Sequence, residues 1–451
     1  MGWAKDNSRV VCVPFAVRTP ENYYVHLFSE NHVRELSEAP EDKLSLHALS
    51  KDMFQPKYTM DGLAVEDRMS ANGSLHSRVL RVVLRSCLGQ LHDSLDRLIS
   101  KTATQLFKAG KKTSDGWTEV SSFAWAKGII AAANSHAFFG ETLSSDPEFL
   151  KAALDYPEDL FKTAEVLRLV PSFLAPIIAP ILMRQHRASR ILVEHLTPVV
   201  EERLQKSHSS DISAHDKPID CIQFFVDANS KKNTWSARKI IQVILGVWFA
   251  ALHQPALSLT YLLDDLCNYP EYVELLREEL ETHDVTGDNL ENLALLDSFL
   301  KESARLHPSD SISVRRKVLQ PFSLTDGTSL QVGDVACVPL QAILQDPSNY
   351  PDSMRFDGFR FVDQTSDGNT ERFTDATSTY PLWGLGKRGC PGRYFAARIL
   401  KIVLAHILIN YDIKMDEGSS NKTRTFSWRS AIVPKATSSL LFRKKCEIAQ
   451  G

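Results

Sequence analysis

The sequence predicts a mainly α-helical fold with a smaller β region, an α+β class. Residues 117–205, 235–266 and 393–408 repeat apolar side chains every three or four positions, which is the period of a helix. Short stretches that alternate apolar and polar residues, or are rich in β-branched ones, stand at 8–35, 309–346 and 425–441, as is typical of strands. Helical patterns cover the larger part of the chain, and this proportion sets the class.

The composition is that of an ordinary globular protein. Of 451 residues, 43% are apolar and 24% are charged, which gives ample material for a core. A net charge of −3 and the lack of a Lys/Arg cluster argue against a nucleic-acid partner. The seven cysteines contain no CxxC pair and are odd in number, so we expect reduced thiols in a cytosol-facing protein.

The N-terminal part is expected to form strands followed by a loop. The strand pattern begins around Val10 and Cys12 and continues at Tyr23 and Tyr24. Residues 54–60 mix aromatic side chains with turn formers and are predicted to be a loop. No signal peptide or transmembrane segment opens the chain, and the apolar run 170–183 is too short to span a membrane and is broken by three prolines.

Residues 75–85 have a helical period and carry a row of arginines. Arg78, Arg81 and Arg85 stand at i, i+3 and i+7, positions that share one helix face. The pattern leaves two interpretations open, a solvated basic stripe and a basic surface that binds another group.

The longest helical run, residues 235–266, is apolar on nearly every side between Ile240 and Leu252 and is therefore expected to be buried. Pro255 lies inside it. Because proline has no N–H for the carbonyl four residues earlier, the Ala251 carbonyl should be released and the helix should kink. We expect this carbonyl to serve as an acceptor for water.

Glu302 and Arg305 lie three residues apart on the predicted helix 293–308, so they share a face. Alone, such a pair is usually an exposed ion pair of small effect. Farther on, residues 309–346 are expected to form short strands with a hairpin turn at Asp326-Gly327. Residues 425–441 form a last candidate hairpin, with residues 432–434 at its tip.

One cysteine, Cys390, stands among glycines in residues 383–392, with Arg388 two positions before it and a helical pattern directly after it. A thiolate is a strong metal ligand, and backbone N–H groups and the positive end of a following helix stabilise its charge. Glycines allow the backbone to fold tightly around the sulfur. The stretch is therefore a candidate site for one iron held by one sulfur.

Residues 383–392 resemble the haem-binding loop of the cytochrome P-450 family, FxxGxRxCxG, with Trp383 in place of the usual Phe. The resemblance implies the cytochrome P-450 fold over residues 1–451 as a single catalytic domain. Eukaryotic members usually carry an N-terminal membrane anchor, and we expect none within this sequence. It implies haem b, iron protoporphyrin IX, with Cys390 as the axial ligand in a loop that includes Gly384 and Gly392. It further implies that Arg388 and Arg316, or failing that Arg315, hold the haem propionates.

Other family features fall on residues already described. The resemblance places Arg360 with Glu302 and Arg305 in one buried network, residues 311–314 against the substrate, residues 54–60 over the pocket, and the tip residues 432–434 close to the substrate. The arginine helix would clamp a propionate and offer a basic surface to an electron donor, through His76, Arg78 or Arg81. The usual tryptophan of that helix is missing.

The kinked helix departs from the family. The family pattern (A/G)Gx(D/E)T supplies an acid and an alcohol that relay protons, whereas this chain has Ala250-Ala251-Leu252-His253-Gln254. His253 and Gln254 are the catalytic candidates: His253 carries a proton near neutral pH, and Gln254 holds a water. Rearrangement, dehydration or coupling without oxygen insertion stays an alternative, and so does a non-catalytic haem-binding protein.

The function implied is a haem-thiolate monooxygenase that oxidises a hydrophobic small molecule, such as a terpenoid or indole alkaloid of fungal secondary metabolism. The sequence contains no nucleotide-binding loop, so electrons are expected from NADPH through a separate NADPH-cytochrome reductase. We expect a monomer that faces the cytosol, on the endoplasmic reticulum membrane if an anchor precedes this sequence and otherwise in the cytoplasm.

Overall fold

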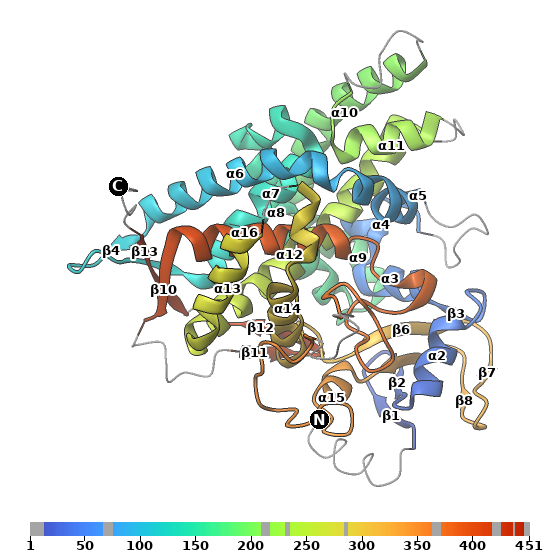
Figure 1. The fold of residues 1–451 in the computed structure, drawn as a ribbon. Coiled ribbons are helices and arrows are strands. Elements are labelled where there is room, and N and C mark those ends of the chain that lie inside the picture. The colour runs from blue at the N-terminus through green and yellow to red at the C-terminus, as the bar shows by residue number, and fades with distance from the viewer. Residues whose placement is uncertain are drawn as a thin grey trace.

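The computed structural model describes residues 13–65, 75–208, 217–230, 235–283, 287–362, 371–416, 425–435 and 438–445. Helices make up most of these residues, as predicted, and they gather on one side of the molecule, while the larger sheet lies on the other (Figure 1). Val10 and Cys12, and most of the segment between α10 and α11, lie outside the described residues.

The long helices form the helical side. They are α6 (Leu88–Ala109), α7 (Ser122–Ser144), α8 (Pro147–Leu167), α10 (Arg187–His208), α11 (Cys221–Ser230), α12 (Ala237–Asn268), α13 (Glu271–Thr282), α14 (Ala294–Leu306) and α16 (Arg393–Asn410). Shorter helices complete it: α2 (Glu30–Glu38), α3 (Leu46–Phe54), α4 (Pro56–Thr59), α5 (Leu75–Arg78), α9 (Ala175–Leu182) and α15 (Leu340–Leu344).

The β structure comprises two sheets and two separate hairpins. The five-stranded sheet has the order β1-β2-β9-β6-β3, and the four-stranded sheet has the order β10-β13-β5-β4. The strands of the first are β1 (Phe15–Arg18), β2 (Tyr23–His26), β9 (Val335–Val338), β6 (Ser313–Val318) and β3 (Leu44–Ser45). Those of the second are β10 (Tyr411–Met415), β13 (Ser439–Lys444), β5 (Thr118–Ser121) and β4 (Lys111–Lys112). The hairpins pair β7 (Phe322–Ser323) with β8 (Ser329–Leu330) and β11 (Thr425–Trp428) with β12 (Ala431–Pro434).

Helix α12 runs through the middle of the core. Trp248 and Phe249 on it are buried and meet aromatic rings of α7 and α3. Within the described residues α12 is the one helix long and apolar enough to cross a membrane, but 56% of its most apolar window is buried inside the protein. Its hydropathy therefore fits a core helix.

The surroundings of Pro255 in α12 differ from the prediction in one detail. Pro255 lies inside the helix, as expected, but the Ala251 carbonyl is not left to water. The side-chain amide of Asn134, on α7, donates a 2.7 Å hydrogen bond to it. A buried carbonyl without its helical donor needs another partner, and a neighbouring helix supplies one here.

Two local predictions near the N-terminus were wrong. Residues 54–60 are not a loop: α3 ends at Phe54, Gln55 adopts a left-handed conformation, and Pro56 starts the one-turn helix α4, where its missing N–H costs nothing. The arginine helix is not one regular α-helix, because α5 continues as a π-helical segment, η1 (Val79–Leu84). Arg81 and Arg85 still meet neighbouring parts of the chain, the carbonyls of residues 387 and 389 and the ring of Tyr394, whereas Arg78 lines the cavity.

Two further predictions need correction. Trp117 to Ser121 do not start the helical region, because Thr118–Ser121 is the strand β5 and pairs with β13. At the last hairpin the tip is Arg429-Ser430 and not residues 432–434, which belong to β12. The hairpin turn predicted at Asp326-Gly327 is confirmed between β7 and β8, with Gly327 at a φ of 88°.

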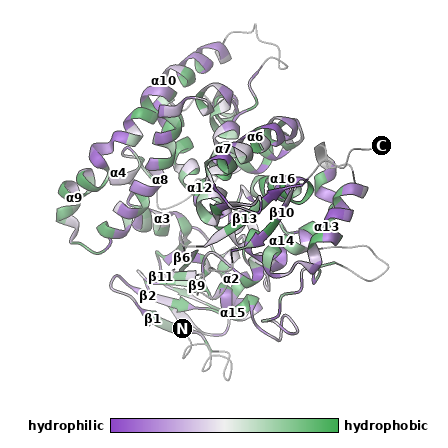
Figure 2. Cartoon of the chain, turned by 90° about the vertical axis from the view of Figure 1, so that its left-hand side faces the viewer, coloured by the Kyte–Doolittle hydropathy of each residue, from purple (hydrophilic) through white to green (hydrophobic). Residues whose placement is uncertain are grey.

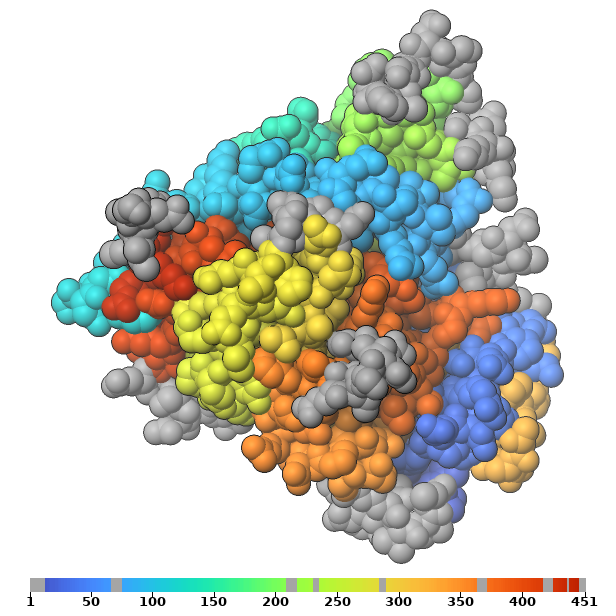
Figure 3. Space-filling view, in the orientation of Figure 1, coloured from blue at the N-terminus to red at the C-terminus, as the bar shows by residue number. Residues whose placement is uncertain are grey.

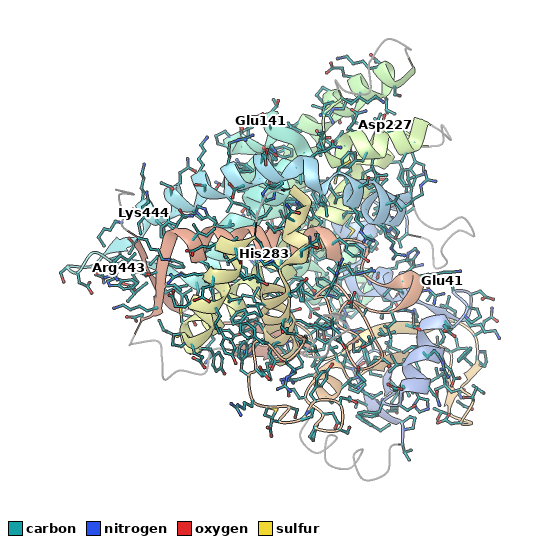
Figure 4. The ribbon with its side chains drawn as sticks, viewed as in Figure 1. Glu41, Glu141, Asp227, His283, Arg443 and Lys444 are labelled. Atoms are coloured by element: carbon teal, nitrogen blue, oxygen red, sulfur yellow. The ribbon has the colours of Figure 1, made fainter. Side chains whose placement is uncertain are left out.

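Segments far apart in the chain meet below the helices. In Figure 3 the N-terminal residues (blue) lie beside the segment that leads to Cys390 (orange). Glu41, labelled in Figure 4, comes from this N-terminal segment and forms an ion pair with Arg388. This junction closes one side of the candidate site.

Candidate functional site

A cavity of about 1760 Å³ lies between α12, the N-terminal segments and the Cys390 loop. Residues from α12 form one wall, and residues from β1–β2, α3–α5, α8 and the β11–β12 hairpin form the others. Most of the lining side chains are apolar, among them Phe54, Leu63, Leu80, Val247 and Phe249. The cavity is therefore suited to hydrophobic ligands.

Cys390 is the one cysteine of the described residues that lines this cavity. Burial raises the pKa of its thiol, while backbone N–H groups of Gly392 and Arg393 that donate to the sulfur, and the charges of Arg393 and Arg81, work to lower it. Those same donors would stabilise a thiolate, and a bound cation would complete the deprotonation. The sulfur is thus placed and supported as a metal ligand.

Tight turns before Cys390 hold its loop in shape. Gly384 and Gly386 have φ angles of 71° and 61°, which favour glycine. The Cys390 amide donates a 2.6 Å hydrogen bond to the Trp383 carbonyl. The Trp383 indole N–H donates to the Phe373 carbonyl at 2.7 Å, so Trp383 anchors the loop to the neighbouring segment. Gly392 caps α16 directly after the cysteine.

A buried guanidinium group near this loop indicates where an anion would bind. Arg316 is 2% exposed, and its Nε has no hydrogen-bond partner. Burial, together with the nearby charge of Arg388, lowers the pKa of Arg316 to about 10. A buried cation of this kind needs a carboxylate, and a haem propionate would supply one. Arg315 lines the cavity, which Arg316 does not, but Arg315 already pairs with Asp310 and donates to Ser430, so Arg316 keeps the propionate role as a prediction.

The other propionate candidates divide into two groups. His76 and Arg78 line the cavity, and burial lowers the pKa of His76 to about 4, so its ring is neutral at neutral pH. Arg388 pairs with Glu41 and donates to the Ser37 carbonyl. Arg81 donates to the carbonyls of Lys387 and Gly389, at 3.1 and 2.8 Å, and therefore braces the cysteine loop itself.

The structure brings Glu302, Arg305 and Arg360 together. Arg305 forms two hydrogen bonds to the Glu302 carboxylate, at 2.7 and 2.9 Å, and both side chains are fully buried. The Arg360 Nε lies 3.2 Å from each oxygen of the same carboxylate. Arg305 and Arg360 also donate to backbone carbonyls between Leu344 and Arg355. The network therefore joins α14 to the chain that leads to the cysteine loop.

His253 and Gln254 both line the cavity from α12. The Gln254 side chain is exposed toward it, while the Nε2 atom of His253 is buried and has no hydrogen-bond partner. Burial lowers the pKa of His253, the charge of Lys127 lowers it further, and the charge of Glu158 opposes both. These two neighbours come from α7 and α8, so no pattern around His253 in the sequence could indicate them.

A ring of charged side chains, here called the charge ring, also lines or borders the cavity. Arg168 on α8 binds Glu21 of the β1–β2 turn through two hydrogen bonds, at 3.2 and 2.9 Å. Glu165 pairs with both Arg168 and Arg429, at 3.1 and 2.9 Å. The Trp428 indole also donates to Glu165. The charge ring thus joins α8, the β1–β2 turn and the β11–β12 hairpin, a connection that the sequence did not indicate.

The fold and this site define a haem-thiolate enzyme: a cysteine sulfur with amide donors on the wall of a mostly apolar cavity, and a buried arginine near the cysteine loop that has no carboxylate partner among the described residues, fit haem. The family model for cytochrome P-450 matches residues 52–442, and the chain belongs to the cytochrome P-450 family. The predicted family and fold are therefore confirmed.

Named relatives agree with this assignment. The chain is 31% identical over 422 residues to cytochrome P-450 monooxygenase 151 of Postia placenta, covering 91% of this chain and 82% of that protein. It is 30% identical over 435 residues to cytochrome P-450 monooxygenase olcJ of Penicillium canescens, covering 93% and 79%. The solved structure of retinoic-acid-bound cyanobacterial CYP120A1 shares the fold, with a TM-score of 0.74 at 18% identity over 98% of this chain and 94% of that chain.

The chain is accordingly an oxidoreductase, a cytochrome P-450 monooxygenase, and its family implies haem as cofactor and a redox partner as electron source. The roles of the individual site residues, including iron ligation by Cys390, stay predictions that the experiments below test.

Proposed function

We propose that this enzyme oxidises a bulky hydrophobic small molecule, a terpenoid or indole-alkaloid skeleton of fungal secondary metabolism. The cavity of about 1760 Å³ and its mostly apolar lining support this proposal. The wall also carries polar side chains, and among them Ser309 and Asn229 offer hydrogen bonds that would orient one hydroxyl or N–H group of such a skeleton.

The same proposal assigns proton delivery to α12. The bound haem supplies the iron at which dioxygen is activated. Gln254 offers its amide to a water inside the cavity, because this side chain both donates and accepts hydrogen bonds but does not ionise. His253 supplies the ionisable group. The Ala251 carbonyl already accepts a hydrogen bond from the Asn134 amide, and the proposal gives it no role.

Replacing Gln254 by alanine is expected to waste reducing equivalents. A neutral hydrogen bond is worth about 1 kcal/mol, which equals roughly a fivefold change in a rate. With NADPH, a reductase and a substrate chosen by its spin-state shift, Gln254→Ala should therefore release about five times more hydrogen peroxide per NADPH than the parent. Ser258→Ala, one turn farther along α12 and outside the cavity lining, serves as the control.

Two results would count against the proposal. Equal peroxide yields from the parent and Gln254→Ala would remove Gln254 from proton delivery. Product formed by the parent without NADPH or dioxygen would favour the alternative function, rearrangement, dehydration or coupling without oxygen insertion, which the missing acid–alcohol pair keeps open.

The electron donor is proposed to be an NADPH-cytochrome reductase that docks beside the cysteine loop. Arg85 and Lys387 are exposed there, and Val82 is 58% exposed between the arginines of η1. Basic side chains around a small apolar contact suit an acidic partner surface close to the iron ligand.

We further propose that the enzyme works on the cytosolic face of the endoplasmic reticulum membrane. Leu169, Phe173, Ile177 and Ile181, on and before α9, are 59–74% exposed, and Leu169 also lines the cavity. Figure 2 shows α9 at the edge of the molecule, with hydrophobic residues on it. Such a patch can enter the outer layer of a lipid bilayer next to a cavity that takes hydrophobic substrates.

The double substitution Phe173→Ser with Ile177→Ser tests this surface. Loss of two large apolar side chains should cost about 3 kcal/mol of membrane affinity. In flotation with phosphatidylcholine and phosphatidylserine vesicles, the parent should rise with the lipid and the double variant should stay in the dense layer. Val332→Ser, an exposed apolar residue elsewhere, is the control, and equal flotation of the parent and the double variant would refute the proposal.

A further inference from the structure

His253 stands between the cavity and the protein surface. It lines the cavity from α12, and its buried Nε2 has no hydrogen-bond partner. Its neighbours Leu252 and Ala256 are fully buried apolar residues. Gln254 beside it does not ionise, so His253 is the side chain within residues 250–257 that can carry a proton.

An ion pair joins the two helices that pack on α12 close to His253: Asn134 of α7 bonds the Ala251 carbonyl, and the Trp248 indole donates to the Ala153 carbonyl of α8. Lys127 of α7 pairs with Glu158 of α8, and Lys162 approaches the second oxygen of Glu158 at 3.6 Å. The Glu158 side chain is 36% exposed and that of Lys127 is 18% exposed, whereas neither lines the cavity. The pair is therefore partly open to solvent and belongs to the two helices that flank His253 on α12.

The charges of Lys127 and Glu158 influence the pKa of the His253 imidazole. Lys127 works to lower the pKa of His253 and Glu158 works to raise it, and His253 in turn acts on Glu158. Burial works to raise the pKa of Glu158, but the hydrogen bond and charge of Lys127 outweigh it and keep the carboxyl ionised. A partly exposed, ionised carboxylate attracts protonated water.

We propose that Glu158, held in place by Lys127, gathers protons at the surface and that His253 passes them into the cavity, which gives this chain a proton route in place of the missing acid–alcohol pair. The inference rests on the proposed monooxygenase function. Lys127 is a positioning residue in this route, since it acts through Glu158.

The transfer is balanced within the imidazole ring. With its pKa below 6.5, His253 is neutral at neutral pH. One ring nitrogen takes up a proton from the side of Glu158 as the N–H bond at the other nitrogen breaks and its proton passes to a water on the cavity side. One proton crosses, the ring returns to the neutral state as the other tautomer, and no electron moves.

The first test measures the pKa of His253 directly. In the reduced holoenzyme saturated with carbon monoxide and labelled at histidine Cε1, the NMR signal of His253 is the one that His253→Gln removes. Glu158→Gln should lower this pKa, because it removes a negative charge, and Lys127→Met should raise it, because it removes a positive one. Glu148→Gln, an exposed residue at the start of the same helix, should leave it unchanged.

The second test measures proton supply without any added substrate. With NADPH and its reductase, Glu158→Gln should oxidise NADPH about tenfold more slowly than the parent and show a larger rate ratio between water and deuterium oxide, as expected when general acid catalysis is lost. Glu148→Gln should match the parent, and an unchanged carbon monoxide spectrum confirms that each variant is folded.

An unmoved His253 pKa in both Glu158→Gln and Lys127→Met would overturn the route. If Glu158→Gln shifted the pKa of His253 but oxidised NADPH at the parental rate, the route would be overturned too. Glu158 would then influence the charge state of His253 without supplying its protons. Neither result touches the proposed function, which fails only if the parent forms product without NADPH or dioxygen.

Discussion

Glu302→Ala is expected to yield almost no soluble haem-loaded protein. The substitution leaves the guanidinium of Arg305 fully buried, and that of Arg360 nearly so, without a carboxylate. Breaking a buried charge pair by removing one partner costs about 3–5 kcal/mol. Because the whole stability of a protein is about 5–15 kcal/mol, this single change takes a large part of it.

The chain offers a matched control for this prediction. Glu274 and Arg277 have the same spacing and also form an ion pair, but the Glu274 side chain is 72% exposed. Exposed pairs contribute about 0–1 kcal/mol, so Glu274→Ala should change little. Yield, haem content and the urea midpoint of unfolding would be compared for both variants. Normal expression and haem content of Glu302→Ala would show that the buried network does not hold the fold.

Cys390→Ala is expected to abolish the red-shifted absorption of the reduced carbon monoxide adduct. This band requires a thiolate bound to the haem iron, and Cys390 is the cavity-lining cysteine of the described residues. Loss of the ligand should remove the band completely and not merely weaken it. Difference spectra of the purified, reduced protein give the measurement.

The remaining described cysteines supply the controls. Alanine at Cys87, Cys221, Cys267 or Cys337 should leave the band in place, because none of these lines the cavity. A Cys390→Ala variant that kept the band would prove that another cysteine binds the iron. Burial raises the pKa of the Cys337 thiol to about 12, so that cysteine in particular is a poor source of thiolate.

The sequence predicted the helical class, the central helix and the cysteine loop because each depends on local pattern. The period of residues 235–266 and the glycines around Cys390 are visible without a structure. The two E-x-x-R pairs show that sequence spacing alone does not predict whether an ion pair is buried. Glu274 and Glu302 have identical spacing to their arginines, and only tertiary packing makes one pair exposed and the other buried.

The errors have the same origin. Strand β5 is four residues long and gains its hydrogen bonds from β13, more than 300 positions away along the chain. The π-helical turn η1 and the pairing of Lys127 with Glu158 likewise depend on neighbours from other segments. The partner of the Ala251 carbonyl could not be foreseen, because Asn134 precedes it by 117 residues.

That last contact bears on how the cavity can change shape. A proline whose freed carbonyl has no partner lets a helix bend, but here Asn134 of α7 bonds that carbonyl, and the rings of Phe138 and Phe139 pack against Trp248 nearby. We therefore expect α7 and α12 to move together. We expect the cavity to adjust to substrates of different size at the segments that the charge ring joins. The ion pairs there can break and form again with little loss of packing contacts.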